Sequence, residues 1–530
     1  MKPLDRITLA LFLSFLSAVV LAAGGTADVR SSGEVRPLSF LRPTIVPEPV
    51  SLAFSETEEV SLKSVRIACA KDEAAIGAWA RGKAKDWFGA CAELVPASGR
   101  LVDGGPEAYE IAADPTNGVL VRANAPEGVR HAFHTLRQCA IPLRGTLKTS
   151  GYVLPVLEIR DAPALSFRGI HLCWFPGVGA KHMERLVRLA AFYKFNYAVI
   201  EFWGVYRWKK HPGFAWPDAH VSADDVARLV EIGRDLGIVL CPQFNVFGHA
   251  AMSRFIGGKH ATLDIRPEYA PVFEPMGGWN WCLSNPETRR IQADMIDELC
   301  EAFGNPPYFH IGCDEAEEPS CPVCRAGDYA ELVGGHIGFV RNHLKSRDIR
   351  TMMWHDMLLD GADGRWTGYY ARGDARTAEL VDMLPRDVVI CDWYYGPPRQ
   401  GFFGRLLGLD IEYPTLAFFQ GKGFEVLTCP WQNHDGIPEQ AACARRLGLK
   451  GLLATTWNRA YGRDFAWAMI YASCGAWGTS HLRYANAFGT LVFASHLRQA
   501  GADVPVSSRD ESGFVTDDVP QRPYVGVDNN

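Results

Sequence analysis

From Phe167 onward, short runs rich in aliphatic and aromatic residues alternate with segments whose apolar positions recur at helical spacing. The runs are Phe167–Leu172, Asn196–Phe202, Ile238–Val246, Tyr308–Cys313, Ile349–Trp354, Val388–Trp393, Phe424–Cys429 and Gly451–Trp457. Strands that alternate with helices pair in parallel, so eight such units predict an α/β fold, a (β/α)8 TIM barrel over residues 165–498. An open doubly wound sheet is the competing architecture. The absence of a glycine-rich phosphate loop after the first run favours the barrel.

A separate block of about residues 38–160 precedes the barrel. It contains two predicted strands, Val65–Ala68 and Tyr109–Ile111, and two predicted helices, Ala74–Phe88 and Gly128–Gln138. This mixture indicates a small α+β domain. After about Ala500 the chain becomes polar and rich in Asp, Ser and Pro, which predicts a disordered tail over residues 500–530.

The first residues have the pattern of an export signal. Lys2 and Arg6 precede an uncharged apolar run, Ile7–Ala22, and small residues follow it. This is typical of a cleaved secretory signal peptide over residues 1–23. An uncleaved membrane anchor is the alternative, but the run is shorter than the ~20 residues that a spanning helix needs. We therefore expect an exported protein, periplasmic or extracellular, without stable membrane association after signal removal.

The composition is that of a globular protein. The 530 residues are 48% hydrophobic, 22% charged and 11% aromatic, which excludes a wholly disordered, collagenous or coiled-coil chain. Lys and Arg total 54 against 60 Asp and Glu, and the net charge is −6. Without a basic excess, nucleic acid is not an expected partner, and small neutral or polar ligands are favoured. The sequence does not define the oligomeric state.

The 14 cysteines are too sparse for a disulfide scaffold, and several lie in apolar runs typical of buried positions: Cys173, Cys241, Cys313, Cys391 and Cys429. Cys321-Pro-Val-Cys324 differs in its spacing, which suits zinc ligation or a tight local bridge. A zinc site needs two further ligands, and no second pair at motif spacing is present. We therefore predict no cofactor and no metal, with Cys321 and Cys324 as weak candidates for ligands.

Active sites of (β/α)8 barrels lie at the carboxyl ends of the strands. The fourth run ends in His310-Ile-Gly-Cys-Asp314-Glu315. Two adjacent carboxylates repel each other unless a ligand, metal or proton compensates, which argues for function. Because neighbouring strand residues point to opposite faces, both carboxylates can reach one ligand only if the backbone leaves β geometry. Gly312 lowers the conformational cost of that departure. The alternative is a pair of acids that caps the next helix.

Aromatic residues lie at several of the other strand ends. They are Trp354, Trp393 with Tyr394 and Tyr395, Trp431 and Trp457. Such rings predict an aromatic-walled pocket, which suits a sugar, because the C–H faces of a sugar pack on indole while its hydroxyls need hydrogen bonds. Arg168 and His249 are the candidates for supplying those bonds. Any single tryptophan could instead belong to the core.

Four short motifs are distinctive: His310-x-Gly-x-Asp-Glu315, Phe167-Arg-Gly169, Gly248-His249 and Trp457 in Thr-Thr-Trp-Asn. Together they resemble glycoside hydrolase family 20, the β-N-acetylhexosaminidases. Phe247-Gly-His and the Cys before Asp314 look closer to the hexosaminidase D-like branch. Glu107-x-Tyr109 and the segment from Gly128 to Gln138 resemble the small domain that precedes the barrel in that family.

The resemblance implies an exo-acting, retaining hydrolase that removes terminal β-linked N-acetylhexosamine, GlcNAc or GalNAc, by substrate assistance. Glu315 would be the general acid and base, and Asp314 would orient the 2-acetamido group and stabilise an oxazolinium intermediate. Arg168 would hold sugar hydroxyls and His249 would support the acid pair. The implied substrate-binding aromatic residues are Trp354, Trp393, Tyr395, Trp431 and Trp457.

The sequence also departs from the family pattern. Arg459, Gln243 and Asn245 stand where acidic residues are common, and Cys429–Asn433 lacks the tyrosine that holds the acetamide, for which Tyr394 or Tyr395 could substitute. These departures leave the sugar epimer, the linkage and the 2-substituent open, and the sequence does not define the aglycone. A catalytically silent glycan-binding protein on the same barrel is the main alternative. A metal-dependent barrel hydrolase is disfavoured, because His171 stands alone on the first strand.

Overall fold

The computed structural model describes residues 42–71, 73–143, 151–176, 178–217, 219–250, 262–274, 278–396, 413–431, 436–457, 463–479, 496, 497, 499 and 500. The predicted signal peptide and all but the first residue of the predicted tail lie outside these residues. Among the helices in the described ranges, none is long and apolar enough to cross a membrane.

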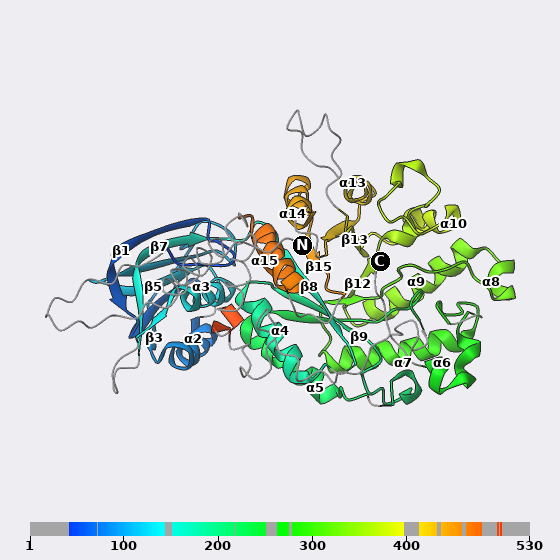
Figure 1. Ribbon diagram of the computed structural model, residues 1–530, viewed down its shortest axis with the longest axis horizontal. Helices are drawn as coiled ribbons and strands as arrows, with labels where there is room; N and C mark the ends of the chain where they lie inside the picture. The colour runs from blue at the N-terminus through cyan, green and yellow to red at the C-terminus, as the bar shows by residue number, and fades with distance from the viewer. Residues whose placement is uncertain are drawn as a thin grey trace, which may run out of the picture.

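The N-terminal part is a sheet with two helices packed against it, drawn in blue and cyan in Figure 1. Its strands follow the order β1-β7-β4-β5-β2-β3, and β6 pairs with β7. The bounds are β1 Ser51–Ser61, β2 Ser64–Cys69, β3 Cys91–Leu94, β4 Tyr109–Asp114, β5 Gly118–Ala123, β6 Ile141–Pro142 and β7 Tyr152–Asp161, with helices α2 Glu73–Phe88 and α3 Pro126–Cys139. In β4 buried and half-buried residues alternate, so Tyr109, Ile111 and Ala113 face the core.

The second part is a closed barrel of eight parallel strands, in the order β8 to β15 around the ring. The bounds are β8 Phe167–Trp174, β9 Tyr197–Phe202, β10 Val239–Gln243, β11 Tyr308–His310, β12 Arg350–Trp354, β13 Val389–Trp393, β14 Glu425–Cys429 and β15 Gly451–Ala454. Each strand coincides with one of the eight runs in the sequence, which confirms the predicted (β/α)8 fold. Three strands, β10, β11 and β15, end three residues earlier than the pattern predicts.

Helices surround the barrel, as Figure 1 shows. The longer helices are α4 Ala180–Phe192, α5 Ala223–Leu236, α7 Pro286–Ala302, α9 Tyr329–Lys345, α13 Pro414–Gly421, α14 Gly436–Leu447 and α15 Arg463–Trp477. The connections contain the shorter helices α6 Thr262–Ile265, α8 Pro322–Ala326, α10 Ala375–Ala378 and α11 Leu380–Met383. They also contain the 3-10 helices η1 Pro212–Phe214, η2 Pro267–Val272, η3 Asp356–Leu358 and η4 Gly364–Trp366. Ser222 and Asp225 form a reciprocal capping box at the start of α5. One apolar cluster joins the helices to the outside of the barrel. A second cluster fills its interior.

The two parts meet at a buried polar junction beneath α15. Asp161, at the end of β7, accepts hydrogen bonds from Tyr109 Oη at 2.5 Å, Lys194 Nζ at 2.8 Å and Trp477 Nε1 at 2.6 Å. Lys194 has no exposed surface, so its charge is compensated by Asp161. The junction fixes the small domain at the amino end of the barrel strands.

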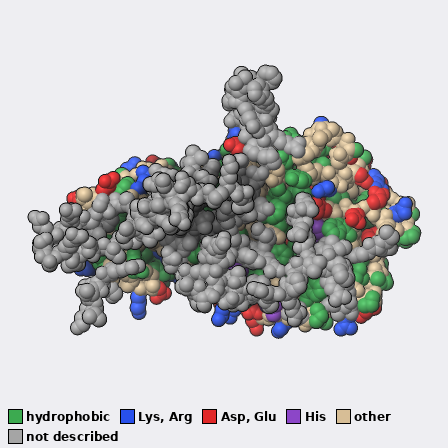
Figure 2. All heavy atoms as spheres, in the orientation of Figure 1, with side chains coloured by type: hydrophobic (Ala, Val, Ile, Leu, Met, Phe, Trp, Pro, Cys, Tyr) green, Lys and Arg blue, Asp and Glu red, His purple; other side chains and the backbone are tan. Residues whose placement is uncertain are grey.

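The described surface carries both signs of charge in close proximity. In Figure 2, acidic and basic side chains lie interspersed along the barrel half of the molecule. This distribution agrees with the small net charge of −6.

Candidate active site

The loop after β11 brings the two adjacent carboxylates together. The strand ends at His310, and the backbone then enters left-handed geometry at Gly312 (φ 67°), Cys313 (φ 75°) and Glu315 (φ 46°). As a result, both acids reach one imidazole. His249 Nε2 lies 3.3 Å from Asp314 Oδ2 and 3.4 Å from Glu315 Oε2. The predicted departure from β geometry is thus confirmed.

Two glycines permit this convergence. A Cβ on Gly312 would lie 2.5 Å from Asn245 Cγ, and one on Gly248 would lie 2.1 Å from the carbonyl oxygen of Asp314. Both contacts are far below van der Waals distance. The loop that carries His249 and the loop that carries the acids therefore pack closely, with no room for larger residues at these two positions.

Asp314 is buried and held by a chain of polar side chains. Asn245 Nδ2 donates to Asp314 Oδ1 at 3.2 Å, and Gln243 Nε2 lies 3.1 Å from Asn245 Oδ1. Gln243 Nε2 also donates to Glu201 Oε1 at 2.9 Å. The chain runs across the carboxyl ends of β9, β10 and β11, so the amides at 243 and 245 orient Asp314.

Glu315 is fixed at its backbone but open at its carboxyl group. Its N–H donates to Asp356 Oδ2 at 2.8 Å, and its carbonyl accepts from Trp279 Nε1 at 2.6 Å. The side chain keeps 36% of its surface exposed, and Arg372 Nη2 lies 3.5 Å from Oε1. An anchored backbone with an accessible carboxyl group suits an acid that exchanges protons with a bound substrate.

Asp356, in η3, is a third carboxyl group beside the pair and is fully buried. Besides the bond from Glu315, it accepts one from Trp393 Nε1 at 3.1 Å. Burial raises the pKa of Asp356 well above its ordinary value, and the neighbouring charge of Asp314 raises it further; the two N–H donors offset only part of this. The sequence analysis did not identify Asp356.

Four of the predicted aromatic residues form one cluster at the ends of β13, β14 and β15. Trp393 stacks on Tyr395 at 5.0 Å, and the Tyr395 ring meets the Trp431 ring edge-on at 5.3 Å. Trp457 Nε1 donates to Tyr395 Oη at 2.5 Å. Tyr395, Trp431 and Trp457 are half-buried, so they present ring surface next to the acids. Tyr370, which the sequence reasoning missed, packs against Trp393 at 4.8 Å.

Comparisons with known proteins agree with this arrangement. Residues 195–395 match the family model described as glycosyl hydrolase family 20, catalytic domain. The matched segment runs from β9 to β13, includes Asp314 and Glu315, and is similar to a glycosyl hydrolase family 20 catalytic domain. This confirms the family that the motifs suggest, and a glycosidase is the class of enzyme that the family contains.

The curated relatives that the chain matches are distant. Beta-hexosaminidase 1 of Coccidioides posadasii is 21% identical over 419 residues, which cover 70% of this chain and 64% of that protein. Hexosaminidase D of Bos taurus is 22% identical over 294 residues, 50% of this chain and 76% of that protein. The chain therefore spans less than two thirds of the first relative's length.

A solved structure has the same fold. The GH20 exo β-N-acetylglucosaminidase from Vibrio harveyi, in complex with N-acetylglucosamine, superposes with a TM-score of 0.61 at 15% identity, covering 89% of this chain and 79% of that one. At 15% identity, this similarity shows a shared fold and nothing further.

Two of the predicted substrate-binding residues lie elsewhere in the barrel. Arg168 is the second residue of β8, at its amino end, roughly 20 Å along the strand from Trp174 at the opposite end. Its buried guanidinium forms an ion pair with Glu107, with Nη1 3.0 Å from Oε2, and donates to the carbonyls of Leu165 and Lys194. The prediction that Arg168 holds sugar hydroxyls is wrong, because the acids lie at the carboxyl ends of the barrel strands, whereas Arg168 lies at the amino end and pairs with Glu107.

Trp354 also lies at a different place from the one predicted. It ends β12 but points into the barrel, where its ring packs 4.2 Å from that of His310 and 5.6 Å from that of Trp457. It has no exposed surface, so it lies beneath the aromatic cluster rather than on its wall.

Two groups of side chains in the described residues have the composition of a metal site. His171, Cys173 and Glu201 lie inside the barrel, where the Glu201 carboxylate already accepts from Gln243 and from Trp203 Nε1. The second group is Glu274, Cys282, Cys321 and Cys324. Glu274 and Cys282 thus lie close to the Cys321–Cys324 pair, although no local motif marks either residue.

Proposed function

We propose that this chain is an exo-acting, retaining β-N-acetylhexosaminidase that uses the substrate's own acetamido group as the nucleophile. The proposal rests on one observation above all: Asp314 and Glu315, adjacent in sequence, converge on His249 although regular β geometry would separate them. The names of the relatives and the ligand in the Vibrio harveyi structure support the choice of sugar.

In the first step, the acetamido carbonyl oxygen attacks the anomeric carbon and the glycosidic C–O bond breaks. Glu315 gives its proton to the departing oxygen, and an oxazolinium ion forms within the sugar. Asp314 accepts a hydrogen bond from the acetamide N–H and stabilises the positive charge that develops there. Its place in a buried chain of polar groups holds it ready for this charge without reorganisation.

In the second step, water attacks the anomeric carbon and transfers a proton to Glu315, which regenerates the acid. The acetamide is released from the ring, and the anomeric configuration is retained after two inversions. The half-buried rings of Tyr395, Trp431 and Trp457 would pack against the terminal sugar.

The test uses aryl N-acetyl-β-glucosaminide and N-acetyl-β-galactosaminide. Wild type should release the aryl alcohol from at least one of them, and Glu315→Gln should be slower by ~10²–10⁴-fold. The matched control is Glu317→Gln, an exposed acid on the same loop, which should retain full activity. Equal, slow release by wild type and Glu315→Gln on every hexosaminide would leave a silent glycan-binding protein instead.

Substrate assistance has its own test. An aryl β-glucoside with a hydroxyl in place of the acetamido group lacks the nucleophile. Wild type should cleave it more slowly by about 10³-fold or more, because an intramolecular nucleophile acts at a high effective molarity. Comparable rates on both glycosides would argue for an enzyme nucleophile.

A further inference from the structure

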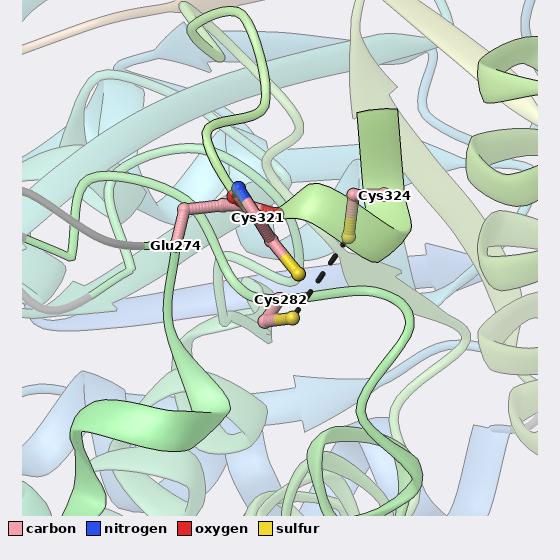
Figure 3. Close-up of side chains that lie close together, drawn as sticks. All are labelled: Glu274, Cys282, Cys321 and Cys324. Carbon is pink, nitrogen blue, oxygen red and sulfur yellow. Dashed lines mark hydrogen bonds between the residues drawn. The ribbon is translucent and has the colours of Figure 1, made fainter. Parts of the chain in front are cut away.

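Three cysteines and a glutamate from distant parts of the chain converge beside the active-site loops. Glu274 follows η2, Cys282 precedes α7, and Cys321 and Cys324 lie at the start of α8. One ligand atom from each lies within 4.8 Å of the other three, and three of the four residues are buried, with Cys321 partly exposed. Figure 3 shows the side chains meeting from separate segments.

We propose that these four side chains form a structural zinc site. Zn²⁺ prefers four ligands in a tetrahedron, with Zn–S distances of about 2.3 Å, and two sulfurs on such a tetrahedron are therefore about 3.8 Å apart. Cys282 Sγ and Cys324 Sγ are 3.8 Å apart. The spacing of Cys321 and Cys324 is that of a C-x2-C zinc half-site.

The charge and the ligand orientation fit the same ion. Three thiolates and one carboxylate carry the same total charge as the four thiolates of an all-cysteine zinc site. The Glu274 carboxylate is oriented by the N–H groups of Ser320 and Cys321, which lie 2.9 and 2.6 Å from Oε2. The Ser284 hydroxyl lies 3.2 Å from Cys324 Sγ and 3.4 Å from Cys282 Sγ, as an outer-shell partner of metal thiolates does.

The site would connect the two loops that build the catalytic centre. Cys282 lies on the loop that also carries Trp279 and Asn280, and Cys321 and Cys324 follow the loop that carries Glu315. Trp279 donates to the Glu315 carbonyl and its ring lies 4.4 Å from that of His249. Asn280 bonds both the N–H and the carbonyl of Glu317, at 3.1 and 2.7 Å. Zinc would cross-link two largely irregular segments that no barrel strand holds together.

A disulfide between Cys282 and Cys324 is the competing outcome. It would require the sulfurs to approach from 3.8 Å to about 2.05 Å, and it would not account for the convergence of Cys321 and Glu274 on the same point. Four converging ligands are explained by zinc and not by that bridge.

The first experiment measures zinc in the full-length chain, purified from zinc-supplemented culture, by plasma mass spectrometry. We expect about one zinc per chain in wild type, as in a closed structural site, and at least tenfold less in Cys324→Ser. Cys91→Ser is the matched control, because Cys91 is exposed on β3 and outside the cluster, and it should retain the zinc. A wild type without zinc, zinc that persists in Cys324→Ser, or a Cys282–Cys324 disulfide found by peptide mass mapping would each overturn the proposal.

A second variant covers the case in which Cys324→Ser fails to fold. Glu274→Gln keeps an amide oxygen to accept from Ser320 and Cys321 but removes the anionic ligand, so zinc affinity should fall at least tenfold while the circular dichroism spectrum stays native. After chelation and reloading with cobalt chloride, wild type should show sulfur-to-cobalt charge-transfer absorption. Unchanged zinc affinity in folded Glu274→Gln would contradict the assigned ligand set.

Hydrogen exchange tests the connection between the loops. Removing zinc should speed amide exchange in residues 278–285 and 314–324 at least tenfold, and adding zinc chloride should reverse it. None of these measurements uses a glycoside, so the zinc proposal and the glycosidase proposal can fail independently.

Discussion

The backbone N–H of Glu315 donates a 2.8 Å hydrogen bond to Asp356 Oδ2, and this bond crosses from the end of β11 to the end of β12. A buried carboxyl group thus fixes the peptide of the proposed general acid, while the Glu315 side chain remains free to exchange protons. The same carboxyl group accepts from Trp393 Nε1, so it also positions the aromatic cluster.

Asp356→Asn should flatten the pH dependence of stability. Because burial raises the pKa of Asp356, the native state binds a proton that the unfolded state releases above about pH 4. The contribution of Asp356 to the free energy of unfolding is therefore fully present below that pH and is lost as the pH rises through the raised pKa. Each tenfold difference in proton affinity between the native and unfolded states corresponds to about 1.4 kcal/mol of this contribution. Urea unfolding between pH 5 and 9 measures the effect. The exposed Asp224→Asn should keep the wild-type slope, and an unchanged slope in Asp356→Asn would refute the assignment.

Gly312→Ala should damage both stability and activity. The left-handed backbone alone costs an alanine roughly 1–2 kcal/mol, and the new Cβ would collide with Asn245, the residue that holds Asp314. We expect a clearly lower free energy of unfolding and a turnover at least tenfold lower. Gly338→Ala is the control, because a Cβ there meets nothing within 4 Å in the middle of α9, and it should be neutral or stabilising. Wild-type activity in Gly312→Ala would show that the loop geometry is not needed.

Arg168→Met should destabilise the fold without changing the affinity for substrate. Glu107 is largely buried, and the substitution removes the guanidinium that pairs with its carboxylate. Breaking a buried ion pair in this way lowers the free energy of unfolding by about 3–5 kcal/mol. The double variant Arg168→Met with Glu107→Gln should recover part of the lost stability. Chemical unfolding and the KM of the folded fraction are the two measurements, with the exposed Arg100→Met as control. A large rise in KM with unchanged stability would restore Arg168 to the substrate site.

The Glu107 carboxyl group should also contribute to acid stability. Although burial raises its pKa, bonds from His131 and Arg168 outweigh this and lower the pKa to about 2. Its contribution is present above the ordinary carboxyl pKa and is lost as pH falls toward 2. Glu107→Gln should therefore make the free energy of unfolding depend less on pH between about 4.5 and 2. An identical acid transition in wild type and variant would contradict the low pKa.

Tyr395→Phe should lower turnover at least tenfold, whereas Tyr394→Phe should have little effect on it. Tyr395 lies with Trp393 and Trp457 in the cluster beside the acids, while Tyr394 points outward and packs on Tyr369 and Tyr413. Burial raises the pKa of Tyr395 well above 10, so its hydroxyl stays a donor. Of the two tyrosines left open by the sequence, the geometry favours Tyr395 as the group that holds the acetamide. Steady-state kinetics on the better aryl hexosaminide decide between them, and the reverse order of effects would favour Tyr394.

The sequence by itself determined the barrel, the place of the acids and the family. Short apolar runs and helical spacing are local properties, so all eight strands are visible without a structure, and Asp314 and Glu315 are visible because barrel chemistry lies at strand ends. The same pattern could not say that Arg168 pairs with Glu107 of the small domain or that Trp354 turns inward, since both depend on which residues pack together in the folded chain.

Only the tertiary structure decided which distant residues meet. Asp356 joins Glu315 across two strands, Asn245 joins Asp314, and Glu274 and Cys282 join Cys321 and Cys324. These contacts are made between loops of irregular backbone, whose sequences have no hydrophobic periodicity from which the contacts could be predicted. Their geometry is set by closure of the barrel, which brings consecutive strand ends together regardless of the length of chain between them.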